Sequence, residues 1–234
     1  MKIALLGYGK MGKTIEKLAV DKGHEIVYKL DSEFEEGTLK DADVAIEFSV
    51  PEAAVKNITR SFSEGIPIVC GTTGWLDDYN NVLNKCEERN AGFIYASNFS
   101  VGVNLFFNIN AYVAKLMVPW DEYAVSIEEI HHTEKKDAPS GTAITIAEGI
   151  IENTDKENWK LDEGSGNTIP ISAKREGDVK GTHSVAYRST IDTISIKHEA
   201  HTRDGFAKGA ILAAEWLVKK GSGVYTMKDV LGIS

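Results

Sequence analysis

Short apolar runs alternate with segments of helical spacing through the first hundred residues. Strand-like runs stand at residues 2–6, 25–30, 43–48, 67–70 and 92–96, and helical patterns at residues 13–22, 51–64 and 76–89. Strands that alternate with helices of this length are typical of a parallel sheet with helical crossovers. We therefore expect a Rossmann-like α/β domain in this part of the chain.

The pattern changes after residue 104. Helices are expected at residues 105–117, 140–151 and 206–220, and strands at residues 123–129, 183–189 and 193–199. The link at residues 189–192 suits an antiparallel hairpin between the last two strands. The stretch from 152 to 178 is polar and contains glycine without clear periodicity, so we expect a functional or mobile irregular loop there. The middle of the chain is therefore predicted to form an α+β domain with a mixed sheet.

A glycine-rich turn joins the first expected strand to the first expected helix. Gly7, Gly9 and Gly12 form the pattern GxGxxG. In such a turn the first glycine permits a tight bend, the second lets the backbone approach a pyrophosphate, and the third allows close helix–strand packing. Asp31 closes the second strand, at about the 20-residue spacing where a carboxylate holds the ribose hydroxyls. Together these features indicate dinucleotide binding rather than a plain glycine turn.

The acidic residue also bears on the choice of cofactor. The carboxylate of Asp31 attracts a ribose 2′-hydroxyl and repels a 2′-phosphate. The next residue is Ser32 rather than arginine, while Lys29 lies close by and its direction stays open. NADH is therefore modestly favoured over NADPH. Two further segments, GTTG at 71–74 and ASNF at 96–99, follow expected strands at the edge where open parallel sheets bind ligands, and ordinary strand-to-helix turn chemistry is the less favoured explanation.

Imidazole and ammonium groups gather in residues 131–142, HHTEKKDAPSGT, after the expected strand at 123–129. A solvated loop, a metal site and an anion site with a proton donor are the three interpretations. Adjacent residues on an extended segment point to opposite sides, so His131 and His132 are poorly placed to chelate one ion. The chain has neither HExxH nor a cysteine cluster, so no metal is expected.

The anion site has more support from the residue types. His131, His132 and Lys135 supply cationic or hydrogen-bonding groups, and Pro139 precedes a helix that opens with SGT. The amides at a helix N-terminus suit a carboxylate. Histidine has an unperturbed pKa of roughly 6.5, which suits general acid catalysis.

Composition narrows the possible partners. The chain has 234 residues and a net charge of −9, which argues against nonspecific binding to nucleic acid or to an anionic membrane. No apolar run approaches the roughly 20 residues that span a bilayer, and the apolar start is too short for a signal peptide. Two cysteines, Cys70 and Cys86, do not make a disulfide framework. A reduced, cytoplasmic setting is the simplest interpretation.

Residues 129–143 resemble the signature of the dihydrodipicolinate reductase family, the 4-hydroxy-tetrahydrodipicolinate reductases of bacterial lysine and diaminopimelate synthesis. The glycine-rich opening, GTTG at 71–74, ASNFSVGVN at 96–104 and a late Arg203 before GAILAAEWL at 209–217 occur in the family's order. The resemblance runs from end to end. The chain is more compact than the longer family members between Asp31 and Asp43, which weakens Ser32 as a guide to the cofactor.

The resemblance implies a role for each matching residue. His131 is the expected acid, Lys135 is a second proton donor, and a doubly negative cyclic imine is the expected substrate. The residues expected to bind the substrate are His132, Gly141 and Thr142. The cofactor, NADH or NADPH, is expected to contact Gly7, Tyr8, Gly9, Lys10, Met11, Gly12, Asp31, Gly71, Thr72, Thr73, Ala96, Ser97, Asn98 and Phe99. The sequence decides no role for Arg175, Arg188 and Arg203.

The resemblance also implies the domain plan. Residues 1–103 and 206–234 are expected to form the dinucleotide-binding domain, to which the last helix returns. Residues 104–205 are expected to bind substrate and to build a homotetramer through their sheet.

Two other functions stay open from the sequence. One is a different nicotinamide-dependent reductase on the same plan, such as an amino-acid dehydrogenase, which the intact PSGT turn after HHxxxK disfavours. The other is a nucleotide-sensing module without catalysis, which the presence of both His131 and Lys135 disfavours. A substrate-dependent NADH oxidation assay separates all three.

Overall fold

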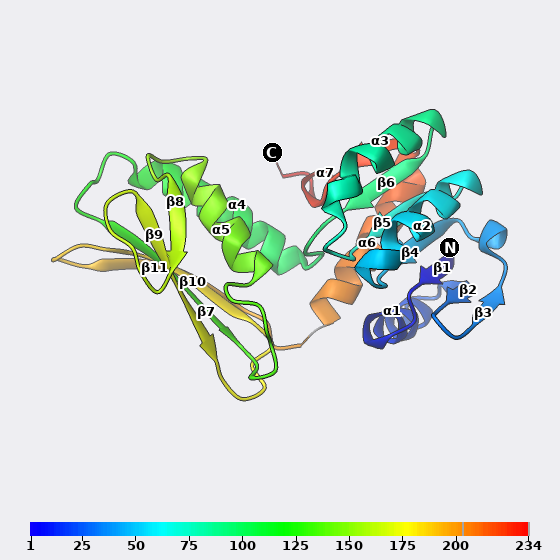
Figure 1. Cartoon of the computed structure of the whole chain (residues 1–234), viewed down its shortest axis with the longest axis horizontal. Coiled ribbons are helices and arrows are strands. Elements are labelled where there is room, and N and C mark those ends of the chain that lie inside the picture. Colours follow the sequence, from blue (N-terminus) through cyan, green and yellow to red (C-terminus); the bar gives the residue numbers. More distant parts are fainter. Residues whose placement is uncertain (203, 234) are drawn as a thin grey trace. The chain divides into compact units, whose positions relative to one another are not determined.

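The chain folds into two compact units, which Figure 1 shows in a computed structural model that describes residues 1–202 and 204–233. One unit is Met1–Val101 with Asp204–Ser234, and the other is Gly102–Arg203. The division therefore falls two residues before each boundary expected from the sequence. Arg203, left undecided by the sequence, lies outside the described residues.

The first unit contains a parallel sheet with one antiparallel edge strand. Its order is β12-β6-β5-β4-β1-β2-β3, and only β3 runs antiparallel to its neighbour. The strands are β1 (Lys2–Leu6), β2 (Glu25–Leu30), β3 (Glu35–Gly37), β4 (Val44–Glu47), β5 (Ile68–Cys70), β6 (Gly92–Tyr95) and β12 (Gly223–Tyr225). The chain crosses from one side of β1 to the other between β2 and β4, which creates the switch point where such sheets bind ligands.

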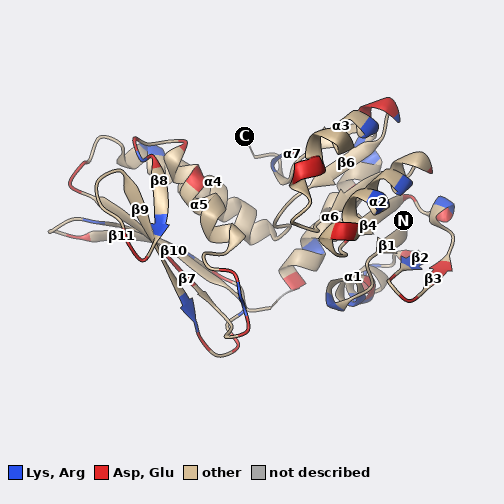
Figure 2. Cartoon of the chain, in the orientation of Figure 1, with Lys and Arg blue, Asp and Glu red and all other residues tan. Residues whose placement is uncertain are grey.

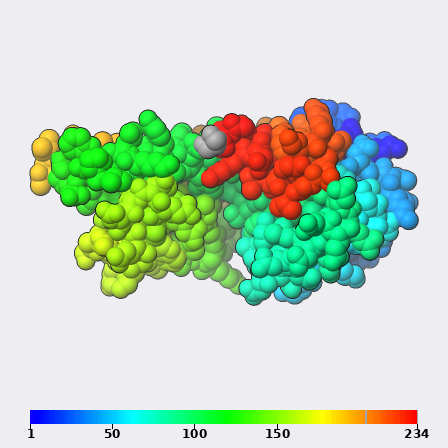
Figure 3. All heavy atoms as spheres, turned by 90° about the horizontal axis from the view of Figure 1, so that it is seen from above, coloured from blue at the N-terminus to red at the C-terminus, as the bar shows by residue number. Residues whose placement is uncertain are grey.

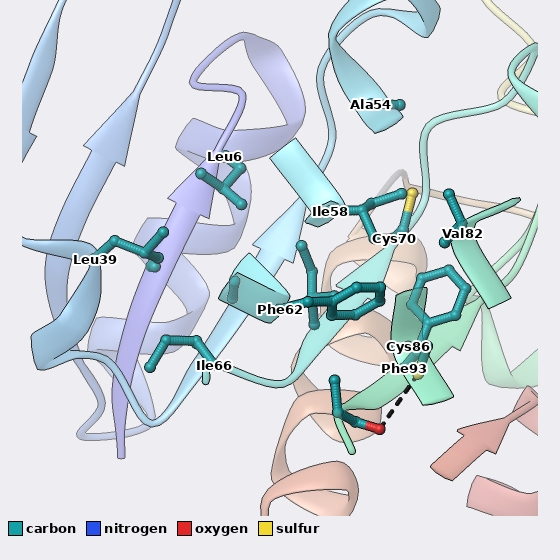
Figure 4. Packing of buried hydrophobic residues seen from close by; sticks show 14 of the residues in the cluster. Leu6, Leu39, Ala54, Ile58, Phe62, Ile66, Cys70, Val82, Cys86 and Phe93 are labelled. Carbon is teal, nitrogen blue, oxygen red and sulfur yellow. Dashed lines mark hydrogen bonds between the residues drawn. The ribbon is translucent and has the colours of Figure 1, made fainter. Parts of the chain in front are cut away.

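Helices cover both faces of this sheet. They are α1 (Lys10–Asp21), α2 (Pro51–Ser63), α3 (Tyr79–Glu88), α6 (Asp204–Lys220) and α7 (Met227–Leu231), with 3₁₀ turns η1 (Leu39–Asp41) and η2 (Leu76–Asp78). On one face Ile58 and Phe62 of α2 pack with Phe93 of β6 (Figure 4). On the other face α1 and α6 share a separate apolar cluster. The sheet is therefore the middle of three layers.

The C-terminal segment belongs to this first unit. It is coloured orange to red in Figure 3, and its strand β12 pairs with β6. Gly209 of α6 lies directly on the backbone of Phe99, because a Cβ at that glycine would stand 1.8 Å from the Phe99 carbonyl oxygen. The expected return of the last helix to the first unit is thus seen in the packing.

The second unit has a mixed five-stranded sheet in the order β11-β10-β7-β9-β8. Its strands are β7 (Ala124–His131), β8 (Asn158–Leu161), β9 (Thr168–Arg175), β10 (Thr182–Arg188) and β11 (Thr193–Glu199). The β7–β9 and β8–β9 pairs are parallel, whereas β10 is antiparallel to β7 and β11. Helices α4 (Val101–Met117) and α5 (Gly141–Ile151) each bury one apolar face in a cluster with this sheet, whereas α4 leaves Leu105, Ile109 and Leu116 exposed. The predicted α+β class and its β10–β11 hairpin are confirmed.

The expectation of an irregular loop at 152–178 is wrong. That stretch contains β8 and β9, and β9 lies inside the sheet between β7 and β8. Pro170 interrupts the pattern, because proline usually indicates an edge strand or no strand. Ile169 and Ile171 on either side of it are nevertheless fully buried with the period of two of a strand.

Acidic and basic side chains are interspersed along the helices of the first unit, whereas α4 and α5 of the second unit carry one each, Lys115 and Glu148 (Figure 2). Buried positions are mostly apolar, with a short set of polar exceptions that the next section uses. None of the helices within residues 1–202 and 204–233 combines the length and the apolarity that crossing a bilayer requires.

Candidate active site

A pocket of about 450 Å³ lies at the switch point of the first unit's sheet. Four residues predicted to contact a cofactor line it, namely Gly7, Tyr8, Gly9 and Asp31. The remaining lining residues are Leu30, Ser32, Phe48, Ser49, Val50, Ala53, Lys56 and Asn57. The carboxylate of Asp31 accepts a hydrogen bond of 2.7 Å from the Ser32 amide, which holds it at the end of β2.

The surroundings of the three glycines are compatible with the roles that the motif predicts for them. Gly7 has a φ of 98°, and a Cβ there would stand 2.1 Å from the Phe48 carbonyl oxygen. A Cβ at Gly12 would stand 2.3 Å from the Gly7 carbonyl oxygen, whereas one at Gly9 would meet no atom within 4 Å. Gly7 and Gly12 therefore serve packing, and Gly9 leaves open space for a ligand. Lys10, Met11 and Gly12 form the first turn of α1. This cradle fits a dinucleotide.

The side chain of Lys29 lies beside this pocket and contacts Glu16 and Tyr8. Its Nζ lies 2.6 Å from Glu16 Oε1 and 4.9 Å from the centre of the Tyr8 ring. The Tyr8 hydroxyl also donates to Glu16, and this hydrogen bond raises the tyrosine pKa. The sequence left the direction of Lys29 open, and the structure points it toward Glu16.

The strand ends after β5 and β6 approach the same pocket. The Ser49 amide donates to Thr72 Oγ1 at 2.8 Å. A Cβ at Gly71 would stand 2.2 Å from the Phe48 ring, so only glycine fits. The rings of Phe48 and Phe99 contact edge to face at 5.9 Å. Phe99 is 1% exposed and its side chain lies in the core, so its backbone is the part left to contact a ligand.

The other predicted residues of these two segments differ in exposure. Thr72 and Asn98 are buried, Gly71 and Ala96 are half-buried, and Thr73 and Ser97 are exposed. The side chain of Asn98 accepts a hydrogen bond from the Ser100 amide at 2.9 Å, which shapes the turn after β6.

A second polar cluster lies in the second unit, at the end of β7. Along this strand every other residue is buried, which places Glu129 and His131 on the face that is otherwise apolar. The sheet register sets His183 of β10 opposite Glu129, and Arg175 of β9 beside His131. Strand pairing thus brings together four ionisable side chains that are far apart in the sequence.

Glu129 is the centre of this cluster and has no exposed surface. The Ser140 amide donates to both of its oxygens at 3.1 Å, and Arg175 Nη2 donates to Oε1 at 3.1 Å. His131 Nδ1 and His183 Nε2 lie 3.5 and 3.7 Å from Oε2. Burial alone would raise the pKa of Glu129, but its contacts with His183, Ser140 and His131 outweigh burial and lower the pKa to about 2.

His131 is 8% exposed, and its ring contacts that of His183 edge to face with centres 5.1 Å apart. Burial lowers its pKa to about 4, and His183, Lys135 and Arg175 act in the same direction. The negative charge of Glu129 opposes this shift. The imidazole is therefore neutral near pH 7 unless further negative charge arrives.

The loop after β7 carries the other predicted substrate contacts. His132 is half-buried, as expected for a residue on the opposite side from His131. Lys135 Nζ contacts both oxygens of Asp137 at 2.7 and 2.8 Å. Arg175 Nε donates to the Lys135 carbonyl at 3.2 Å, which ties this loop to β9.

The predicted carboxylate contacts lie at the start of α5. Ser140 is the N-cap, and its hydroxyl accepts from the Ala143 amide at 3.2 Å. Gly141 and Thr142 form the first turn, and a Cβ at Gly141 would meet no atom within 4 Å. The first turn of α5 therefore has room for an anion beside it.

The sequence assigned no catalytic or binding role to Glu129 or His183. The usable signal was a glutamate at an apolar position of an alternating strand. Arg188, which the sequence left undecided with Arg175, is exposed at the opposite end of β10 from His183.

Glu129, His131 and His183 each offer a possible metal-ligand atom, and these atoms lie within 4.8 Å of one another. The carboxylate already accepts hydrogen bonds from Arg175 and the Ser140 amide. We therefore interpret the group as a hydrogen-bonded cluster. The expectation that no metal is bound stays a prediction.

Comparison with known proteins gives consistent results over the whole chain. Residues 1–99 match the family described as dihydrodipicolinate reductase, N-terminus, and residues 102–231 match dihydrodipicolinate reductase, C-terminus. A 4-hydroxy-tetrahydrodipicolinate reductase of Christiangramia forsetii is 55% identical over 99% of this chain and 98% of its own length. One from Methanosarcina acetivorans is 39% identical over 82% of this chain and 74% of its own length.

Solved structures support the fold. A dipicolinate-bound dihydrodipicolinate reductase from Paenisporosarcina sp. TG-14 superposes with a TM-score of 0.77 at 21% identity, over 97% of each chain. An aspartate dehydrogenase from Thermotoga maritima reaches a TM-score of 0.53 at 14% identity, over 93% of this chain and 96% of its own. The Rossmann-like fold class predicted from the sequence is confirmed.

Proposed function

The chain belongs to the dihydrodipicolinate reductase family, and from this premise we propose how its residues carry out the family's reaction. The protein is an NAD(P)H-dependent oxidoreductase of the diaminopimelate and lysine pathway. It reduces 4-hydroxy-tetrahydrodipicolinate, or dihydrodipicolinate, to tetrahydrodipicolinate. The observation that carries the mechanism is the buried cluster of Glu129, His131 and His183 next to the loop of Lys135.

The residues of the first unit hold the cofactor, whose reduced nicotinamide supplies a hydride when bound. The turn Gly7–Gly12 binds the pyrophosphate through its amides, and Asp31 accepts from the adenosine ribose. The segments Gly71–Thr73 and Ala96–Phe99 line the nicotinamide side. Support comes from the pocket at the switch point and from the contacts of Ser49 and Phe48 with these segments.

The residues of the second unit bind the dicarboxylate and supply the proton. Gly141 and Thr142 hold one carboxylate at the start of α5, and His132 binds the substrate from the loop. Lys135 exchanges its partner Asp137 for the substrate and acts as a second proton donor. His131 is the acid, because a dianion beside it offsets the burial that lowers its pKa.

A coupled assay that generates the substrate in situ, run separately with NADH and NADPH, tests this function. We expect oxidation of the cofactor only when the cyclic imine is supplied. Oxidation with an amino- or keto-acid pair and none with the imine would support an amino-acid dehydrogenase instead. Cofactor binding without turnover of any cyclic imine would support a nucleotide sensor.

Replacing Asp31 by asparagine tests the proposed preference for NADH. The negative carboxylate lies at the pocket, and Lys29 is paired with Glu16. We expect the ratio of kcat/KM for NADPH to that for NADH to rise about tenfold, or roughly 1.4 kcal/mol, when the charge is removed. Steady-state kinetics with both cofactors measures the ratio. The exposed neighbour Glu33, changed to glutamine, is the control, and an equal change there would exclude a specific role for Asp31.

We also propose that the protein is a cytoplasmic homotetramer, with residues 1–103 and 206–234 binding the dinucleotide and 104–205 binding substrate and forming the assembly. Support comes from the sheet of the second unit, whose hairpin exposes Ile191 at 87% and Ile194 at 44%. Light scattering would give four times 25.6 kDa for a tetramer. A mass of 25.6 kDa would contradict the proposal.

A further inference from the structure

Glu129 carries a fully buried negative charge, and the mechanism above assigns no separate role to it within the cluster. Its partners come from three other parts of the second unit, namely Ser140 at the start of α5, Arg175 on β9 and His183 on β10. Burying a charged carboxylate costs much desolvation energy. Several donors must therefore satisfy its oxygens at the same time.

The two oxygens of this carboxylate face different groups. Oε1 accepts from Arg175 and the Ser140 amide, both at 3.1 Å. Oε2 shares the Ser140 amide and faces the imidazoles, with His131 Nδ1 at 3.5 Å. That nitrogen is buried and makes no hydrogen bond of normal length. A small shift would give it a charge-assisted bond to Oε2.

The partners of Glu129 also hold the loop that carries the proposed substrate contacts. Arg175 donates to the backbone carbonyls of Lys135 and Asp137, and Ser140 caps α5. One carboxylate therefore connects the ring of His131, the backbone at Lys135 and the first turn of α5.

The other ring nitrogen of His131, Nε2, has Gly181 as a neighbour. A Cβ at that glycine would stand 3.3 Å from Nε2. Gly181 also has a φ of 148°, which disfavours any other residue. The missing side chain therefore leaves room on the Nε2 side of the ring.

We propose that Glu129 is a positioning residue, which orients His131 through Nδ1 and supports a proton on that imidazole when a dicarboxylate binds. This inference rests on the proposed function. Dianion binding draws one proton from solvent onto the imidazole. Nδ1–H then donates to Glu129 Oε2, and the Nε2 proton passes to the substrate after hydride arrival, which leaves the imidazole neutral.

The pH dependence of kcat follows from every charged or titratable group that faces the imidazole ring of His131. Glu129 on the same strand favours the imidazolium, while His183, Arg175 and Lys135 disfavour it. Removing the charge of Glu129 leaves the bound dianion to favour the proton against His183, Lys135 and Arg175, which all disfavour it. The protonated fraction of His131 in the substrate complex therefore falls off at a lower pH.

Glu129→Gln tests this proposal, with Glu128→Gln as a matched control. Glu128 is the preceding residue on β7, is half-buried on the other side of the strand and contacts Lys174 at 2.5 Å. We expect Glu129→Gln to lower kcat about 10–100-fold at neutral pH and to move the high-pH decline of kcat to lower pH. We expect the NADH affinity of Glu129→Gln to stay unchanged. Glu128→Gln should keep the wild-type dependence of kcat on pH. A fully folded Glu129→Gln enzyme with the wild-type pH profile would overturn the proposal.

A measurement on the unaltered enzyme keeps the proposal testable if the variant does not fold. ¹⁵N-histidine NMR of the full chain with and without pyridine-2,6-dicarboxylate reports the protonation of each ring, and His131→Gln assigns the signal. We expect His131 to be neutral alone and protonated with the dicarboxylate at the same pH. A ring that stays neutral in both states overturns the inference. If His131→Ala retains turnover, the proposed acid itself fails, which is a separate result.

Discussion

His131→Ala should lower kcat by roughly 10²–10⁴, the usual contribution of a general acid, with little change in the affinity for NADH. The loss corresponds to roughly 3–5 kcal/mol of transition-state stabilisation. The effect falls on kcat because the ring is proposed to act on the transition state, while the residues proposed to hold the dinucleotide belong to the other unit. Steady-state kinetics and NADH titration measure the two quantities.

The control for this substitution must separate chemistry from folding. His131 is buried, so alanine also leaves a cavity and some stability is lost. His131→Gln keeps more of the volume without the acid and should lose kcat to a similar degree. His201→Ala removes an exposed histidine and should behave as wild type. Normal turnover in a folded His131→Ala enzyme would remove this residue from the mechanism.

The sequence predicts the layered part of the fold because burial there follows local patterns. Runs such as IALL at 3–6 and VAIE at 44–47 are mostly apolar and are buried on both faces, as parallel strands between two helix layers must be. The glycine turn was predictable for a similar reason, since Gly7 and Gly12 are required by backbone contacts within the same strand–turn–helix unit and its neighbouring strand.

The second unit was harder to predict because its arrangement depends on pairing between distant segments. Pro170 made a strand at β9 look unfavourable, so β9 was not predicted. Without β9, the position of Arg175 beside His131 could not be predicted either. The role of Glu129 could be inferred only from the strand register, which sets His183 opposite it and Arg175 beside His131. Sequence periodicity assigns a face to each residue of a strand, but the partners on that face come from a register that this chain does not encode locally.

Lys135→Ala should damage both turnover and substrate binding, with KM for the imine rising about 10–100-fold, or roughly 1.4–2.8 kcal/mol. Lys135 is partly buried and paired with Asp137, which supplies a ready exchange of one carboxylate partner for another. Burial would raise the pKa of Asp137, but the lysine outweighs it and lowers that pKa. Removing Lys135 therefore also leaves Asp137 as an unopposed negative charge that repels a dianion.

The neighbour Lys136 makes this experiment specific, because it is exposed and has the same charge. Lys136→Ala changes the net charge of the chain by the same amount and should leave KM within about twofold, because the charge of an exposed side chain interacts only weakly through solvent. The double change Lys135→Ala with Asp137→Asn removes the repulsion and should recover part of KM but not kcat. Recovery of KM alone separates electrostatic binding from proton donation. A loss of thermal stability with both kinetic constants intact would instead make Lys135 a structural residue of the loop.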